Sequence, residues 1–193
     1  MSDDFNPNKK GRELLAFAQT ALSEKRFVHS RNVASEAVRL ADKYDCDKDK
    51  AFIAGILHDI RKEISPQEKL AEALKAVPPL DPVEKKEQKL WHGPAGAYFA
   101  KSALGIDDDD VLYAIRFHTI GRADMCLLEQ IVYISDLISA DRTYADVEKF
   151  RRYANESLDK TMRKALRFSR DDLKEKGKDL PLYTIEALQF YNA

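Results

Sequence analysis

Apolar residues recur three and four positions apart along most of the chain, and no segment clearly alternates between apolar and polar residues as a half-exposed β-strand would. This spacing places apolar side chains on one face of an α-helix. The pattern therefore predicts an all-α fold. The predicted helices cover residues 8–24, 27–44, 48–61 and 65–76, a segment that opens at Gly93-Pro94, one that ends at His118, one that follows Gly121, and residues 144–169 and 181–191.

The helix predicted over residues 48–61 is expected at the centre of the core, because AFIAGILHDI is apolar on nearly all sides. Its small residues, including Gly55, would let another element approach its backbone closely. The helix over residues 65–76 is expected at the surface. Ser65-Pro66, with Glu68 three residues after the serine, has the spacing of a capping box.

Length and composition indicate one globular domain. The chain has 193 residues, enough for a full hydrophobic core, and contains no internal repeat or low-complexity linker. Its net charge of -1 argues against a general nucleic-acid binder. No apolar stretch approaches the length of a membrane span, and the polar N-terminus lacks the apolar segment of a signal peptide, so we expect a cytoplasmic protein. Cys46 and Cys126 have no CxxC partner and are expected to be reduced.

Several ionisable side chains occur in apolar helices, where solvation is poor. A single histidine is more often structural than a metal ligand, but His29 continues the apolar face of its helix, and His58 and Asp59 lie within the most apolar helix. Asp136 lies in the apolar run IVYISDLIS. A buried, unpaired carboxylate costs several kcal/mol, so a cation is expected near Asp59 and Asp136.

The other two histidines extend this set. His118 ends its helix, where the helix dipole favours a nearby cation, and His92 directly precedes Gly93-Pro94. Imidazoles and carboxylates from several helices are the expected composition of a metal site with nitrogen and oxygen ligands. One ion would need only three or four of them. Because a carboxylate has two oxygens, Asp59 could bridge two ions, and a dinuclear centre would use all six groups.

The order of these residues resembles a known signature. His29, then His58-Asp59, then Asp136 is similar to the H…HD…D pattern of the HD-domain superfamily of metal-dependent phosphohydrolases, and the two intervening histidines fit its subgroup with two metals. Within that superfamily, the chain resembles the YqeK family, symmetrical diadenosine tetraphosphate hydrolases of bacteria. The segments that carry the resemblance are RFVHSRNVASEAVRLADKY, KAFIAGILHDIRK, WHGPAGAYFA, AIRFHTIG and IVYISDLISADR.

This resemblance spans residues 20–170 and implies one compact HD-domain helical bundle with a dinuclear metal site in its core. Residues 1–19 are then expected to form a helix packed on the domain, and residues 171–193 a helical extension of it. One departure is visible. After Asp136 the family usually reads close to YIEPxR, whereas this chain has Leu137-Ile138-Ser139-Ala140-Asp141-Arg142, which affects substrate contacts more than the metal ligands.

The resemblance also implies the metal ligands. His29, His58, Asp59 and Asp136 would hold one ion, and Asp59, His92 and His118 the other. Family members are associated with iron. The donor types alone suit iron, manganese, cobalt or zinc.

The implied reaction is hydrolysis of diadenosine tetraphosphate to two ADP by a metal-bound hydroxide, with Asp59 and Lys62 as catalytic residues. A dinucleoside polyphosphate is strongly anionic, so local cations are expected to bind it. The expected substrate-binding residues are close in sequence to the metal ligands or offer a hydroxyl or an unhindered backbone: Arg26, Lys62, Thr119, Gly121 and Arg142. ADP or GDP would be product-like ligands.

Three other functions remain open at this stage. A different nucleotide phosphohydrolase, acting on a deoxynucleotide or a guanosine polyphosphate, would use the same ligands. A diiron oxygenase would activate dioxygen instead of water. A nucleotide-sensing module would bind without turnover, but it would not need all six metal ligands. A homodimer is compatible with the sequence, which does not specify the oligomeric state.

Overall fold

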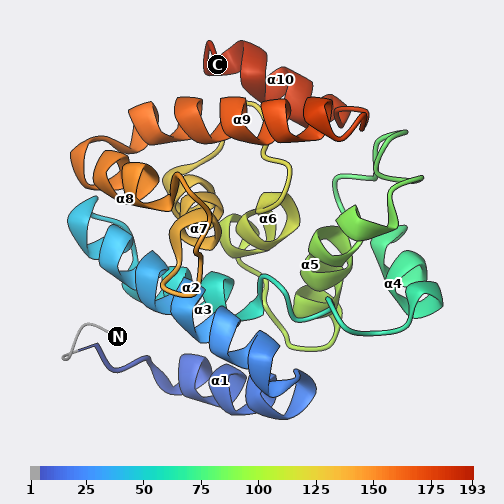
Figure 1. The fold of residues 1–193 in the computed structure, drawn as a ribbon. Helices are drawn as coiled ribbons and strands as arrows, with labels where there is room; N and C mark the ends of the chain where they lie inside the picture. The colour runs from blue at the N-terminus through green and yellow to red at the C-terminus, as the bar shows by residue number, and fades with distance from the viewer. Residues whose placement is uncertain (1–4) are drawn as a thin grey trace.

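The computed structural model describes residues 5–193, and within this range the chain is helical and contains no strand (Figure 1). The predicted all-α fold is therefore confirmed for the described part; residues 1–4 of the predicted N-terminal segment 1–19 lie outside it. The helices are α1 (Lys9–Ala21), α2 (Glu24–Lys43), α3 (Lys48–Leu57), α4 (Pro66–Ala73), η1 (Gln88–Leu90), α5 (His92–Ser102), α6 (Asp109–Phe117), α7 (Leu127–Ile138), α8 (Val147–Glu156), α9 (Leu158–Glu175) and α10 (Leu182–Phe190).

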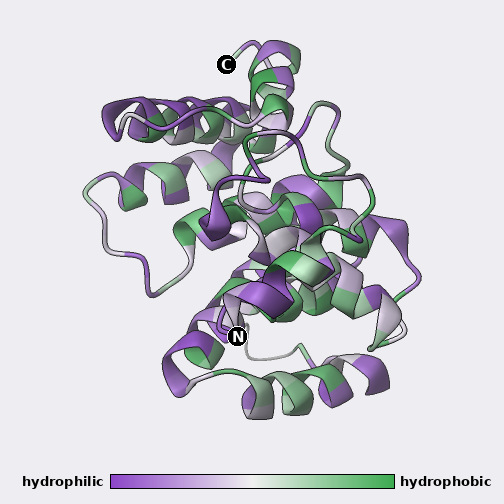
Figure 2. Cartoon of the chain, turned by 90° about the vertical axis from the view of Figure 1, so that its right-hand side faces the viewer, coloured by the Kyte–Doolittle hydropathy of each residue, from purple (hydrophilic) through white to green (hydrophobic). Residues whose placement is uncertain are grey.

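Helices α2, α3 and α7 form the centre of the core. Every residue of α3 from Ala51 to Leu57 is buried, as its all-round apolar sequence predicts. At Gly55 the backbones of α2 and α3 approach so closely that a Cβ would lie 2.7 Å from the Cα of Ala34. Figure 2 shows hydrophobic residues concentrated in the central helices and hydrophilic residues along the outer helices. The close approach of α2 and α3 brings His29 and His58 near each other.

Several predicted helix boundaries are wrong by three or more residues, and two of these differences change how the elements are arranged. The helix predicted over residues 144–169 is divided into α8 and α9 at Ser157, whose backbone is extended at φ -160° and whose side chain accepts from the Lys160 amide to cap α9. The helix predicted over residues 48–61 ends earlier, at Leu57, and residues 58–61 form a turn. His58 and Asp59 therefore lie at a helix end, where their side chains can point in different directions.

The outer elements cover the core. The predicted capping box is present: Ser65 and Glu68 bond to each other's backbone amides at the start of α4. Helix α10 is tied to the loop after α6, since the Thr184 hydroxyl donates to the Ile120 carbonyl at 2.8 Å. No helix within residues 5–193 has the combination of length and apolar character needed to cross a bilayer.

A buried ion pair fastens the connector between α4 and α5 to the core. Arg116 of α6 and Glu84 of the connector form two hydrogen bonds, at 2.7 and 2.8 Å, and neither side chain is exposed. The Glu84 carbonyl also accepts from the Trp91 indole N–H at 2.8 Å. Trp91 directly precedes His92, so this pair links the connector to the segment that carries a site histidine.

Candidate metal centre

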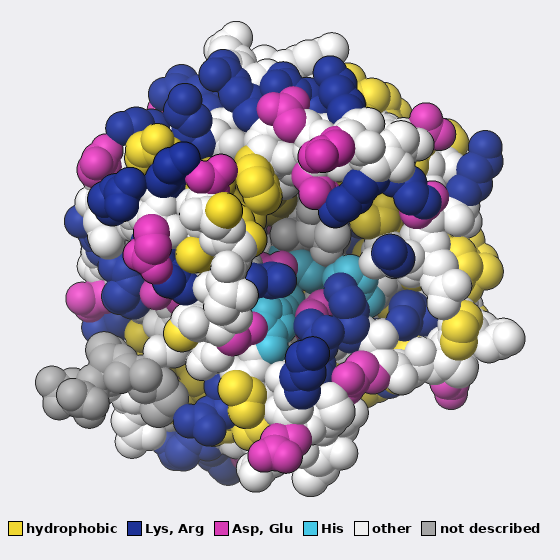
Figure 3. Space-filling view, viewed as in Figure 1, with side chains coloured by type: hydrophobic (Ala, Val, Ile, Leu, Met, Phe, Trp, Pro, Cys, Tyr) yellow, Lys and Arg dark blue, Asp and Glu magenta, His cyan; other side chains and the backbone are white. Residues whose placement is uncertain are grey.

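The four histidines come together although they belong to four separate segments. His29 lies on α2, His58 caps the end of α3, His92 begins α5 and His118 caps the end of α6. All four are at least 94% buried. The ring centroids lie 5.2 Å apart for His29 and His58, 5.0 Å for His58 and His118, and 5.0 Å for His118 and His92. In Figure 3 the histidines lie at the base of a hollow that is bordered by lysine and arginine side chains.

Three of these imidazoles are oriented by the backbone. The Nδ1–H groups of His58, His92 and His118 donate to the carbonyl of the residue three positions earlier, at 2.7, 2.8 and 2.8 Å. A carbonyl only accepts hydrogen bonds, so Nδ1 carries the proton in each ring. The lone pair of each neutral ring is then on Nε2, the atom that faces the centre of the cluster.

His29 is oriented by a carboxylate instead. Its Nδ1 lies 2.8 Å from Asp141 Oδ2, and the other oxygen of Asp141 accepts from Asn32 at 3.0 Å. Sequence reasoning singled out the neighbouring Arg142 but missed Asp141, which lies in a loop without apolar periodicity. A carboxylate behind a ligating histidine fixes the ring and raises its basicity toward a metal.

The two oxygens of Asp59 face two different pairs of histidines. Oδ1 lies 3.2 Å from His92 Nε2 and 3.7 Å from His118 Nε2. Oδ2 lies 3.6 Å from His58 Nε2 and 4.0 Å from His29 Nε2. Metal–ligand bonds of about 2.0–2.2 Å place neighbouring ligand atoms roughly 3.0–3.6 Å apart. The spacing around Oδ1 and Oδ2 is close to that range.

Asp136 of α7 adds a second carboxylate on the Oδ2 side. Its Oδ1 lies 3.1 Å from His29 Nε2, without the alignment of a hydrogen bond, and 4.0 Å from His58 Nε2. The structure thus brings together all six residues that the sequence analysis named as metal ligands, in groups whose ligand atoms lie within 4.8 Å of one another: His29, His58 and Asp59; His58, His118 and Asp136; Asp59, His92 and His118.

The unsatisfied polar atoms of the cluster fit a divalent transition metal. His29 Nε2, His58 Nε2 and Asp59 Oδ1 are buried without a hydrogen-bond partner among the described residues. His92 Nε2 and His118 Nε2 lie 3.1 Å apart and, as acceptors, cannot bond to each other; the Lys62 ammonium lies 2.9 Å from His92 Nε2, and the Thr119 hydroxyl lies beside both rings. Buried acceptors that face one another are unfavourable unless a cation lies between them. Imidazole and carboxylate donors suit iron, manganese, cobalt and zinc.

Except at His29, whose pKa is raised by its two carboxylate neighbours, the shifted pKa values of the cluster favour the protonation states that metal ligands need. Burial lowers the pKa of His58 to about 4, and burial together with the Lys62 ammonium holds the pKa of His92 well below its usual value. Burial on its own would raise the pKa of the carboxyl of Asp59, but the nearby imidazoles and Lys62 outweigh it and hold that pKa well below its usual range. Burial would likewise raise the pKa of Asp136, but the nearby imidazoles of His29 and His58 and the Arg142 guanidinium outweigh it and lower that pKa. Neutral imidazoles and ionised carboxylates are the forms that bind cations.

Three basic side chains named by the sequence analysis surround this cluster. Arg26 Nη1 lies 2.7 Å from Asp59 Oδ2, Arg142 pairs with Asp136, and Lys62 Nζ lies 3.4 Å from Asp59 Oδ1. All three are part-exposed, between 28% and 39%, so they connect the buried ligands with solvent.

Thr119 and Gly121 have different surroundings. The Thr119 hydroxyl lies 3.0 Å from His118 Nε2 and 3.2 Å from His92 Nε2, at the edge of the cluster. The Gly121 amide donates to the Phe117 carbonyl at 2.8 Å, and its φ of +66° lies in the left-handed region that favours glycine. Gly121 therefore has a structural role in the turn that ends α6, and its predicted contact with substrate stays a prediction.

Comparisons with known proteins concern the family of the chain. Residues 26–141 match the HD domain family. The chain is 35% identical over 150 residues to the symmetrical bis(5'-nucleosyl)-tetraphosphatase of Bacillus subtilis (strain 168), covering 78% of this chain and 80% of the relative. It is 35% identical to the enzyme of the same name from Staphylococcus aureus (strain NCTC 8325 / PS 47), covering 91% of both chains.

A solved structure has the same fold over nearly the whole chain. The crystal structure of a predicted HD superfamily hydrolase involved in NAD metabolism from Clostridium acetobutylicum superposes with a TM-score of 0.88 at 37% identity, covering 94% of this chain and 96% of that one. The chain therefore belongs to the HD-domain family of metal-dependent phosphohydrolases and, within it, to the family of symmetrical bis(5'-nucleosyl)-tetraphosphatases.

Proposed function

We propose that the protein hydrolyses diadenosine tetraphosphate at the middle of its phosphate bridge and releases two ADP. The observation that carries this proposal is the position of Asp59, whose two oxygens each face a separate pair of imidazole Nε2 atoms. A carboxylate so placed suits two cations, and relatives that cover most of the chain are named for this activity.

Two divalent transition-metal ions are the proposed cofactors, with iron first and manganese, cobalt and zinc as alternatives. One ion would be held by His29, His58, Asp59 and Asp136, and the other by Asp59, His92 and His118. When bound, such ions would activate a water molecule near neutral pH and neutralise phosphate charge.

The chain's own side chains would bind and orient the phosphates. Lys62, Arg26 and Arg142 are part-exposed cations next to the ligand carboxylates, and each can turn toward a phosphate oxygen. The Thr119 hydroxyl can donate to a phosphate at the other edge of the cluster. Phosphoryl transfer depends chiefly on positioning and charge stabilisation, which these four residues supply. The leaving ADP departs as a phosphate and needs little protonation.

Product analysis of the metal-loaded enzyme tests the proposal. Protein purified without oxygen is analysed for bound metals, incubated with diadenosine tetraphosphate, and its products are separated by chromatography. Two ADP and an unchanged rate without dioxygen are expected. AMP plus ATP would contradict cleavage at the middle of the bridge, a need for dioxygen would indicate an oxygenase, and no cleavage with two metals bound would indicate another substrate or a sensing module.

The bridging role of Asp59 is tested with Asp59→Ala. Loss of an interaction with metals worth several kcal/mol predicts at least about a hundredfold lower activity, together with incomplete metal occupancy. Asp171→Ala is the control, because Asp171 is exposed and pairs only with its neighbour Arg170. An Asp59→Ala variant that keeps both metals and full activity would exclude the bridge.

A further inference from the structure

A cavity of about 300 Å³ lies between the loop after α6, the connector before α5 and the C-terminal end of α9. Thr119 is one of its lining residues, and the Thr119 hydroxyl is also 3.0 Å from His118 Nε2. Lys89 lines it as well, while the Lys89 carbonyl accepts from His92 at 2.8 Å. The cavity therefore adjoins the metal centre on the side of His92 and His118.

The wall of this cavity is mainly apolar. Leu90, Phe168 and Leu173 are half-buried side chains that face it, and Ile120 forms its inner end next to Thr119. The Phe168 ring is stacked on Tyr144 with centroids 5.3 Å apart, so its plane is already fixed. Apolar and aromatic walls with a few polar groups are typical of small-molecule sites.

Charged residues also line the cavity, and four of them are paired with one another. Lys178 and Glu87 pair at 2.9 Å and join the segment after α9 to the connector, and Lys176 pairs with Asp172 at 2.6 Å. Binding cavities for small ligands measure about 300–1,000 Å³. A cavity at the lower end of that range can hold one nucleoside, not an entire dinucleotide.

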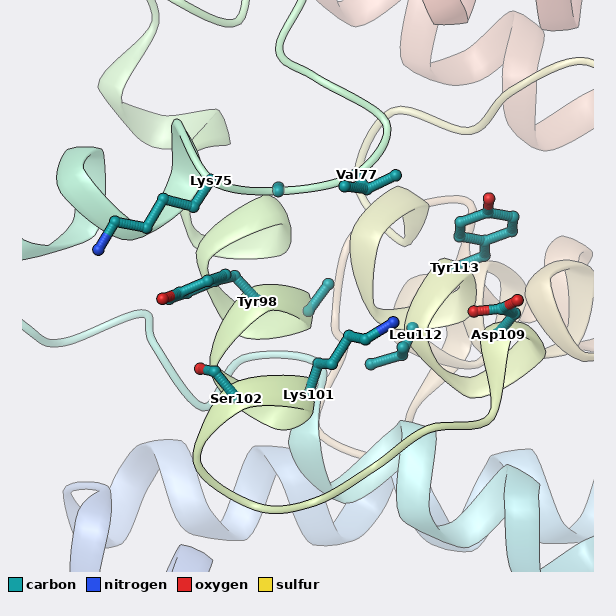
Figure 4. Close-up of a pocket in the computed structure, with 10 residues that line it drawn as sticks. Lys75, Val77, Tyr98, Lys101, Ser102, Asp109, Leu112 and Tyr113 are labelled. Carbon is teal, nitrogen blue, oxygen red and sulfur yellow. The ribbon is translucent and has the colours of Figure 1, made fainter.

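Another cavity, of about 380 Å³, lies between the segment after α4 and helices α5 and α6 (Figure 4). It is lined by residues such as Tyr98, Lys101 and Tyr113, and none of its lining residues belongs to the metal centre or its surrounding cations. A ligand there would have no lining residue in common with the metal centre. Of these two cavities, the one beside Thr119 is the one suited to a substrate that must reach the metals.

The cavity combines two parts of the chain. Leu90 and Thr119 lie within the region that matches the HD domain, residues 26–141, whereas Phe168 and Leu173 lie beyond it on α9. The HD region thus supplies the metal ligands, and the C-terminal helices complete the neighbouring apolar wall.

We propose that this cavity binds the nucleoside of one half of the substrate, with its base against Phe168 and Leu173 and its phosphates leading past Thr119 to the metal centre. The identity of the ligand rests on the function proposed above. In this arrangement the C-terminal helices select a phosphate chain that carries a nucleoside, and the HD region cleaves that phosphate chain.

Binding of ADP and of pyrophosphate, measured by isothermal titration calorimetry on the metal-loaded protein, tests this assignment. Pyrophosphate carries two phosphates without a nucleoside. Leu173→Trp and Leu90→Trp would fill the cavity from two separate elements, α9 and η1. Leu74→Trp is the matched control, because Leu74 is 57% exposed and does not line this cavity.

Each filling variant is expected to weaken ADP binding at least tenfold and to leave pyrophosphate binding unchanged, while the control changes neither. Unchanged ADP affinity in the filling variants, or wild-type protein that binds ADP no better than pyrophosphate, would overturn the nucleoside site. Thermal unfolding verifies that each variant is folded, and two variants from separate elements prevent one misfolded protein from deciding the result.

The two proposals can fail separately. If diadenosine tetraphosphate is cleaved to two ADP but the filling variants bind ADP normally, the cavity assignment is wrong and the reaction stands. If that substrate is not cleaved but ADP binding depends on Leu173 and Leu90, the cavity binds nucleosides and the proposed reaction is wrong.

Discussion

Each histidine of the metal centre uses one ring nitrogen for orientation and directs the other toward the cluster. For His58, His92 and His118 the orienting acceptor is a backbone carbonyl, so no side-chain substitution can remove it. For His29 it is the carboxylate of Asp141. His29 is therefore the one candidate ligand among the four histidines whose orientation depends on a replaceable side chain.

Removal of Asp141 is expected to weaken metal binding. In Asp141→Ala, His29 loses the partner that fixes its ring, and loss of such a partner typically costs about 10–100-fold in metal affinity. Competition with a chelating dye measures that affinity. Asp171→Ala is the control on an exposed aspartate, and equal affinity in the two variants would show that Asp141 does not position His29.

The lowered pKa of His58 leads to a prediction of how the stability of the metal-free protein depends on pH. Its pKa is about 4 in the folded chain against 6.5 as the ordinary value, so below pH 6.5 the unfolded chain takes up a proton that the folded chain refuses. The free energy of unfolding should fall by about 3 kcal/mol from His58 alone between pH 6.5 and 4. The lowered pKa of His92 acts in the same direction.

The other candidate ligands with shifted pKa values contribute mainly outside this window. The pKa of His29 is raised, so its protonated ring stabilises the fold fully below pH 6.5. That stabilisation is lost only as the pH rises through the pKa of the folded state. The pKa values of Asp59 and Asp136 are lowered, so their ionised carboxylates stabilise the fold above pH 3.8. That stabilisation is lost at lower pH. Urea unfolding in the presence of a chelator measures the slope, and His58→Gln should make it shallower. An equal slope in both proteins would exclude His58 as its source.

At the scale of elements, a buried ion pair between Glu84 and Arg116 helps to hold the connector between α4 and α5 on the core. Glu84→Gln or Arg116→Met leaves one charge buried without its partner, which costs about 3–5 kcal/mol. The exposed pair of Glu156 and Lys160 gives the control, because solvent screens it and Glu156→Gln should change the free energy of unfolding far less. Urea unfolding measures both. Equal effects of the buried and exposed substitutions would contradict this role.

Apolar periodicity predicted most helices but not every boundary. Ala154, Leu158 and Met162 keep a helical spacing across Ser157, so the pattern contains no sign that one residue is extended. The break depends on the extended backbone of Ser157 and on the hydrogen bond that its side chain accepts from the Lys160 amide. Hydrophobic spacing records which face is buried, and it does not record the conformation of a single polar residue.

The sequence predicted the candidate metal ligands but not the residues that support them. The metal-ligand candidates stood out because ionisable residues occurred in apolar helices. Asp141 gave no such signal, since it lies in a loop, and the pairing of Glu84 with Arg116 joins residues 32 positions apart. The cavity beside Thr119 was not foreseen either, because α9 forms part of its wall only after the chain has folded. Groups that act through another residue are the ones that local sequence patterns do not reveal.

At the scale of the whole molecule, metal binding should stabilise the entire fold. The candidate ligands come from α2, α5, α7 and the ends of α3 and α6, so an ion would connect most of the core. A ligand at about a thousandfold excess over its Kd adds about 4 kcal/mol, which corresponds to roughly 8–16 °C in Tm for a chain of this size. Thermal unfolding with and without a chelator measures the shift.

The same comparison has an internal control. Asp59→Ala lacks the carboxylate that faces both groups of histidines, so its Tm should respond less to added metal than that of the wild-type protein. An equal response in the two proteins would place the stabilising ion elsewhere.

The distance along the chain between the first and last candidate ligands has a consequence for synthesis. His29 and Asp136 are more than half the chain apart, and Asp141 follows Asp136. A nascent chain on the ribosome therefore has no complete site until most of its length has emerged and folded. The geometry of the folded site would then determine which metal binds. In an unfolded chain, the ion with the highest affinity for exposed histidines would bind instead.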